Sequence, residues 1–323
     1  MSSVKHSDLF KFFSKILPNE DLLYHSPLPP SRPYDPSTAH RFAASKLILS
    51  LTPSEAVYET LNQDGCDGRS RKVLFLHRPF RLDRRRVPHG TLVLASHVRY
   101  DELLTTGWNE ALADEHHVQP TPSSSSSTTE NGKATRLCIQ GHKGDPDRKI
   151  GLVGLLSSSS SVDMSSYAQS LSQAFEGHEA LHIPNNNNDG TSEAGSSNPV
   201  KKAARALASL NAFNPEIIER ILDSARQLEV SPEEVLCLTG APRELGIQSA
   251  LENGMSVLAV GHRRCEMWGL KYLERKAREV FPDLEIQLHE EEEEPRPAPQ
   301  QQGRRNGQHG REIGKKQPRG QQQ

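Results

Sequence analysis

The sequence predicts an α/β fold in which helices and strands form layers. Short runs of β-forming residues alternate with stretches whose apolar residues recur at helical spacing, and no segment repeats at a fixed period. Low-complexity tracts take up about 70 of the 323 residues, which leaves about 250 for one sizeable core or two small ones. The predicted strands cover residues 46–51, 73–76, 91–95, 136–140, 149–156, 234–239 and 256–260.

The predicted helices have recognisable ends. In "TPSEAVYETL", Thr52 is the expected N-cap, Pro53 occupies the first helical position and Glu55 completes a capping box. The segment "NPEIIERILDSARQL" begins with Asn and Pro, and its apolar residues follow helical spacing. The other predicted helices cover residues 163–177, with Gly177 as a candidate C-cap, residues 242–254, which end at Gly254, and residues 262–279.

We expect one folded region, residues 1–289, followed by a charged tail, residues 290–323, that is rich in Gln and Arg. Two polar tracts at about 119–133 and 184–199 are expected to be disordered loops within the folded region. The net charge of −2 argues against general nucleic-acid binding. The basic part of the tail could contact RNA or an acidic partner, although a solvated tail is the simpler interpretation.

The four cysteines lie far apart and form no Cys-x-x-Cys pair. This spacing argues against a zinc ribbon and a disulfide scaffold, and it favours a reducing compartment. The first residues contain no apolar segment of signal-peptide length, and no apolar run approaches the roughly 18 residues that span a bilayer. We therefore expect a cytoplasmic protein, possible also in the nucleus, with no membrane partner.

Polar residues follow three of the predicted strands at the point where each strand ends. His77 follows the second strand, His97 and Asp101 follow the third, and His262 and Glu266 follow the seventh. In open α/β sheets, ligand sites form outside the carboxyl ends of the strands. Imidazole and carboxylate together suit Zn, Fe or Mn, and further ligands would let two ions share a carboxylate and activate a water.

Each of these residues also has an ordinary structural interpretation. A histidine after a strand is often a hydrogen-bonded turn residue, and Glu266 could simply favour the amino end of its helix. Other polar features are weaker signals. The segment 140–151 is rich in glycine but matches neither a P-loop nor G-x-G-x-x-G, and the arginines of residues 81–86 fit a solvated loop as well as a phosphate site. The coincidence of three strand ends is what favours a metal site.

Several motifs resemble one known family. They are "HRPF", "LASHVRYDELLTTGWNEALADEHHV", "IQGHKGDPDRKIGLVG", "LNAFNPEIIERIL", "LTGAPRELG" and "VGHRRCEMWGLKYLERKAREVFP". In this order they look like the Nif-three-like family, also called the GTP cyclohydrolase I type 2 family, from about Leu9 to Leu288. The resemblance implies a three-layer α/β sandwich in two lobes with a dinuclear metal site between them. It also implies a homo-oligomer, often a hexameric ring.

The resemblance assigns roles to individual residues. By motif, His77 matches the first histidine of the family's His-His pair, and Asp101 matches the aspartate that usually bridges the metals. His262 and Glu266 match the final ligand pair, and His97 matches a family histidine beside the site, which we interpret as a supporting residue.

The chain also departs from the family pattern. Arg78 stands where the family has the second histidine, and a guanidinium has no lone pair to offer a metal. The family's N-terminal Asp-Asn-x-Gly motif is missing, and Ser50 occupies the place of an aspartate. We therefore predict that at most one ion binds with full affinity, held by a subset of His77, Asp101, His262 and Glu266.

Two functions follow from these observations. The first is a metal-dependent hydrolase that acts on a nucleotide-like, phosphorylated substrate, with His97 orienting the attacking water. The second is a catalytically weakened relative that works as a regulatory or protein-interaction module, which Arg78 and the charged tail favour. A third and weaker alternative is metal storage by an oligomeric ring.

Overall fold

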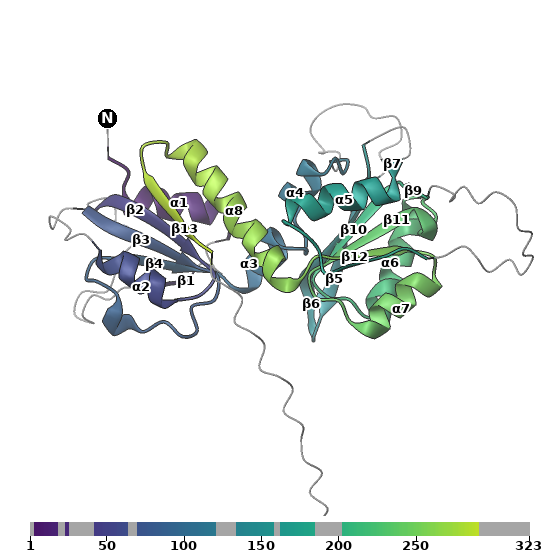
Figure 1. Cartoon of the computed structure of the whole chain (residues 1–323), viewed down its shortest axis with the longest axis horizontal. Helices are drawn as coiled ribbons and strands as arrows, with labels where there is room; N and C mark the ends of the chain where they lie inside the picture. Colours follow the sequence, from purple (N-terminus) through teal and green to yellow (C-terminus); the bar gives the residue numbers. More distant parts are fainter. Residues whose placement is uncertain are drawn as a thin grey trace, which may run out of the picture. The chain divides into compact units, whose positions relative to one another are not determined.

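The computed structural model describes residues 3–18, 23–25, 42–63, 70–120, 134–157, 162–184 and 202–290. They form two β-sheets covered by helices, together with a short two-stranded ribbon (Figure 1). The α/β class predicted from the sequence is therefore confirmed. The two expected polar loops lie largely outside the described residues, and so does nearly all of the expected tail.

The first sheet has five strands in the order β1-β4-β3-β2-β13. Its strands are β1 Leu23–His25, β2 Ala43–Ser50, β3 Ser70–Leu76, β4 Leu92–Ala95 and β13 Glu285–His289. The neighbours β13, β2, β3 and β4 pair in parallel, whereas β1 runs antiparallel to β4. Because β3 and β4 are parallel, the residues that follow them emerge at the same edge of the sheet.

Helices cover both faces of this sheet, as the alternation of its side chains requires. Phe75 of β3 faces α1 (His6–Ile16) and α8 (His262–Val280), and its ring stacks on Phe13 of α1 with centroids 4.7 Å apart. Its neighbour Leu74 points to the other face, where it joins residues of α2 (Glu55–Asn62). The first sheet is thus the middle of three layers.

The second sheet has six strands in the order β5-β6-β10-β11-β12-β8. Its strands are β5 Arg136–His142, β6 Asp145–Leu155, β8 Ala180–His182, β10 Ala206–Leu210, β11 Val235–Thr239 and β12 Ser256–Ala259. The central strands β10, β11 and β12 are parallel, with β6 and β8 antiparallel beside them. The ribbon pairs β7 (Val162–Asp163) with β9 (Ala203–Ala204).

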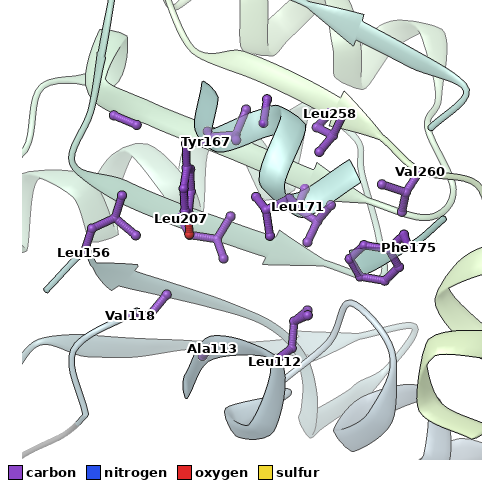
Figure 2. Packing of buried hydrophobic residues seen from close by; sticks show 14 of the residues in the cluster. Leu112, Ala113, Val118, Leu156, Tyr167, Leu171, Phe175, Leu207, Leu258 and Val260 are labelled. Atoms are coloured by element: carbon purple, nitrogen blue, oxygen red, sulfur yellow. The ribbon is translucent and has the colours of Figure 1, made fainter. Parts of the chain in front are cut away.

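The second sheet also lies between helices. The helices α4 (Glu110–Glu115) and α5 (Met164–Ala174) pack on one face, and α6 (Pro215–Gln227) and α7 (Glu244–Glu252) pack on the other. Figure 2 shows the first of these cores, in which Leu171 of α5 packs with Leu207 of β10 and Leu258 of β12. These side chains are 0% exposed, so they anchor the strands that lead into the site.

Helix α8 contributes to the cores of both sheets. Leu270 and Leu273 pack in the core of the first sheet, whereas Trp268 packs in the core of the second. The helix α3 (Val98–Leu104) approaches α8 closely, because a Cβ added to Gly269 would lie 2.5 Å from the carbonyl oxygen of Leu104. The first half of α8 therefore packs closely against α3, the helix that follows β4.

Two expected helix ends are wrong in detail. The N-cap of α2 is Ser54 rather than Thr52, because the Thr52 carbonyl accepts hydrogen bonds from the Ser50 hydroxyl and the Ser54 amide in a turn that keeps Pro53 outside the helix. Helix α5 ends with Phe175 as its C-cap, and Gly177 lies two residues further on, at a φ of 124°. Among the described residues, no helix combines the length and apolar content that a bilayer span requires.

Candidate metal centre

A buried histidine stands at the carboxyl end of β3. His77 is 0% exposed, and its Nδ1 lies 3.2 Å from the carbonyl oxygen of Ser96. Its Nε2 lies 3.3 Å from Oδ1 of Asp101 and 3.1 Å from Oε1 of Glu266. A proton on Nδ1 lets the ring donate to the backbone, and Nε2 donates to the carboxylates when it is protonated. Loss of the Nε2 proton would free a lone pair for a metal ion, with Nδ1 still held by the backbone as in the usual metal-binding histidine.

The segment that follows β4 supplies a second imidazole and a carboxylate. His97 is the N-cap residue of α3, and Asp101 lies in the first turn of that helix. The ring of His97 stacks on that of His77, with centroids 4.9 Å apart and an angle of 7° between the planes. The Nε2 of His97 lies 4.0 Å from Oδ2 of Asp101. Burial of Tyr100 in the same turn fixes the helix against the sheet.

The segment that follows β12 supplies the remaining pair. Gly261 has a φ of 95°, and a Cβ at this position would lie 2.6 Å from Oε1 of Glu179, so the turn requires glycine. Helix α8 then begins at His262, which places His262 and Glu266 one turn apart on the same face, 3.2 Å from Nε2 to Oε1. The two side chains differ in exposure, at 60% for His262 and 1% for Glu266.

Arg78 reaches the same carboxylate. Its Nη2 lies 2.9 Å from Oε2 of Glu266, so the guanidinium donates to the oxygen that the histidines leave free. The backbone of Arg78 is held by a hydrogen bond from its amide to the carbonyl of Leu51. The arginine thus places a positive charge among the candidate ligands, and it occupies one carboxylate oxygen of Glu266.

Neighbouring opposite charges shift the pKa values of His77 and Glu266. Burial disfavours the imidazolium of His77, but Asp101 and Glu266 outweigh burial and raise its pKa to about 9. Burial also disfavours the carboxylate of Glu266, but His262 and His77 outweigh it and lower the pKa of Glu266 to about 2. The Glu266 carboxylate therefore stays ionised although it is buried, and a buried negative charge favours a cation beside it.

The donor set fits one divalent ion. One donor atom each from His77, His97 and Asp101 lies within 4.8 Å of the other two, and Glu266 borders this group through His77. Two imidazoles with carboxylates are ligands that zinc, iron and manganese accept. Arg78 adds no ligand to this set, because its guanidinium pairs with Oε2 of Glu266 and has no lone pair to offer a metal.

Of the residues singled out in the sequence, His77, His97 and Asp101 form one group that could hold a metal ion. Glu266 adjoins this group through His77, and His262 contacts Glu266. Sequence reasoning missed two features of this region. Tyr100 donates a hydrogen bond of 2.6 Å to the backbone carbonyl of Glu266, which positions the first turns of α8. A cavity of about 150 Å³, lined by Asp101 and His262 together with several basic residues, opens beside the cluster.

Comparison with solved structures identifies the fold. The hypothetical protein SA1388 of Staphylococcus aureus superimposes with a TM-score of 0.52 at 11% identity, over 91% of this chain and 99% of that chain. A Bacillus cereus protein related to NIF3 gives a TM-score of 0.49 at 11% identity, over 91% and 99%. HcgD from Methanocaldococcus jannaschii gives 0.49 at 16% identity, over 89% and 99%.

Comparison by sequence gives no further match. No protein-family model matches the chain, and neither does any curated protein. At 11% identity, the likeness to SA1388 concerns the fold. The chain therefore has the α/β fold of SA1388 across nearly the whole of that protein, with a histidine and aspartate cluster that could hold a metal ion.

Proposed function

We propose that the chain is a divergent member of the Nif-three-like family that binds one divalent metal ion and acts as a metal-dependent hydrolase on a nucleotide-like, phosphorylated substrate. The observation that carries this proposal is the convergence of His77, His97 and Asp101, with their donor atoms within 4.8 Å of one another. Zinc, iron and manganese all suit the donors.

The residues of the centre would bind the ion from two sides. His77, Asp101 and Glu266 would hold the ion from the buried side, and His262 or His97 would complete the set from the exposed side. A divalent ion bound there supplies Lewis acidity and makes a neighbouring water more acidic.

When His262 completes the ligand set, His97 is the residue best placed to accept or donate a proton. Its side chain is 39% exposed, and burial lowers its pKa against the opposing charge of Asp101, so it stays neutral near pH 7 and can accept a proton. Arg78 holds Glu266 in place through Oε2.

A second function has its own supporting observation. The Arg78–Glu266 ion pair takes up one oxygen of a carboxylate that a dinuclear enzyme would use. A weakened relative that serves as a regulatory or protein-interaction module would keep the fold and lose turnover. For either function, we propose a homo-oligomer, a hexameric ring by resemblance, in the cytoplasm or the nucleus.

Hydrolysis of generic phosphorylated substrates by the purified chain separates the two functions. The enzyme proposal predicts turnover that a chelator removes, that added metal restores and that Glu266→Ala abolishes. Arg226→Gln is the matched control, because Arg226 pairs with Asp223 on the exposed face of α6. Turnover that survives both chelation and Glu266→Ala contradicts the enzyme proposal. Light scattering of the same samples tests the oligomer.

A further inference from the structure

The cavity beside the candidate metal centre is lined both by residues of the centre and by basic residues. Its volume is about 150 Å³, and Asp101 and His262 of the centre belong to its lining. The lining also includes basic residues from two separate parts of the fold, namely His142, Lys143 and Arg148 of the β5–β6 hairpin and Arg243 at the start of α7. A molecule in this cavity would therefore contact residues of the centre and basic residues together.

The hairpin turn is built to present its basic residues. Gly141 has a φ of 87°, Lys143 a φ of 52° and Gly144 a φ of 82°, so three residues in the left-handed region make the turn tight. Arg220 of α6 fixes the turn by donating hydrogen bonds of 2.6 Å to the carbonyl of Gln140 and 2.9 Å to that of Gly141.

The positive charges are incompletely neutralised. Arg148 Nε is buried and has no hydrogen-bond partner among the described residues, and the nearby carboxylate of Glu102 lies 3.8 Å away. Within the described part of the chain, Lys143 and Arg243 make no ion pair. Lys143 and Arg243 therefore bring positive charge to the cavity lining without an opposite charge among the described residues, and Arg148 Nε lacks a hydrogen-bond acceptor, so the lining favours an anion.

The histidine of this group responds to the same positive field. Burial lowers the pKa of His142, and the neighbouring charges of Arg148, Lys143 and Arg243 lower it further, while Glu216 opposes them. His142 is therefore neutral near pH 7, and it can offer a hydrogen bond without adding charge.

We propose that this cavity binds the phosphate group of the substrate, with Arg148, Lys143 and Arg243 as its contacts, so that the rest of the substrate extends toward Asp101 and His262. The inference rests on the proposed function, since it concerns the substrate of the same centre. A guanidinium offers paired donors that match phosphate oxygens, and an ammonium adds a point charge. Nothing in this arrangement selects a purine or a pyrimidine.

The volume of the cavity limits how much of the substrate it can enclose. Sites that enclose a drug-sized ligand usually measure about 300–1,000 Å³, so a cavity of about 150 Å³ encloses only a part of a nucleotide. We infer a small phosphorylated compound, or a larger one whose phosphate alone enters the cavity. The phosphate would then determine the orientation of the bond that reacts.

Titration calorimetry with inorganic phosphate tests this inference on the full-length, chelator-treated protein, so that no metal can bind the anion. We expect binding at low salt, and we expect Arg148→Gln and Arg243→Gln each to weaken it about ten-fold. Arg226→Gln removes an exposed charge elsewhere and should leave the affinity unchanged. Acetate at the same concentration should compete poorly, since it offers fewer oxygens and less charge.

Three results would overturn the inference. They are absence of phosphate binding, equal loss of affinity in Arg226→Gln, and competition by acetate as strong as that by phosphate. Thermal unfolding checks each variant, and the exposed Arg243 keeps the test decisive if Arg148→Gln fails to fold. Metal content is measured on the same preparations without chelator, so a failure of the metal proposal is recognised separately from a failure of phosphate binding.

Discussion

The two ends of strand β3 each bury a histidine, and the two histidines behave in opposite ways. At the amino end, His6 of α1 places Nε2 3.4 Å from the carbonyl of Arg71, and at the carboxyl end His77 follows the strand. Both are 0% exposed. Burial and the charge of Arg71 lower the pKa of His6 to about 4, whereas the carboxylates around His77 raise its pKa to about 9.

The difference shows that burial alone does not make a functional histidine. At the amino end, the imidazole is a neutral core residue that accommodates one hydrogen bond. At the carboxyl end, α3 and α8 bring Asp101 and Glu266 against the ring, and the strand direction determines which end receives them. The site is thus a property of the end of the sheet rather than of the residue type.

The largest expected effect is that of replacing His77, and it distinguishes the carboxyl end of β3 from the amino end. Replacing His77 with Ala leaves Asp101 and Glu266 buried without their shared partner, so we expect about 3 kcal/mol of destabilisation and loss of the bound metal. His6→Gln is the matched control, and it should keep the metal. Elemental analysis and thermal unfolding of both variants provide the measurement. Retention of metal in His77→Ala would refute the assignment of this end as the metal centre.

His6 at the amino end should contribute to the loss of stability at low pH. The folded protein holds the pKa of His6 at about 4, below the ordinary 6.5, so the unfolded chain binds more protons between these values. Stability therefore falls as pH decreases from 6.5 toward 4, by about 2–3 kcal/mol from this residue. Urea unfolding at stepped pH measures the slope of stability against pH, and His6→Gln should flatten it.

His116, whose pKa burial also lowers to about 4, accounts for part of any slope that persists. An unchanged slope in His6→Gln would contradict this view of the amino end.

A smaller effect tests the arginine at the carboxyl end. Arg78→His removes a charged hydrogen bond to Glu266, which lowers the free energy of unfolding by about 1–2 kcal/mol. The new imidazole also supplies a nitrogen with a lone pair that can bind a metal ion. We expect a second ion per chain in this variant at millimolar zinc. Arg78→Met is the control, which removes the charge without adding a ligand. Equal metal content in the two variants would show that Arg78 is not what restricts the centre to one ion.

The smallest effect is expected at the exposed side of the same centre. His262 is 60% exposed, so His262→Ala should change stability by less than about 1 kcal/mol while weakening metal affinity by about ten-fold. Competition with a chromophoric chelator measures the affinity. A loss of stability as large as that of His77→Ala would remove the distinction between the buried and the exposed side.

Much of the fold follows from local sequence signals. The seven predicted strands all occur in the structure, because their apolar β-forming runs are strong signals at short range. The strand β10, Ala206–Leu210, was missed because Ala and Ser carry little strand preference, and its place between β6 and β11 comes from tertiary packing. The strand β13 was missed in the same way, since it is determined by pairing with β2 from the other end of the chain.

The site was predictable in part for a related reason. Residues after strands can be located from the strands themselves, so His77, Asp101 and His262 were found without knowledge of the sheets. The stacking of His97 on His77 and the hydrogen bond from Tyr100 depend on how α3 meets α8, which no local pattern encodes. The basic residues that line the cavity come from a hairpin turn and a distant helix, so no local pattern in the sequence brings them together.

The central claim is that the carboxyl end of β3 holds one divalent ion. Elemental analysis of the purified chain, equilibrated with zinc and freed of loosely bound metal, tests it most directly. We expect one ion per chain in the wild type and none in His77→Ala. Two tightly bound ions per wild-type chain, or none, would contradict it.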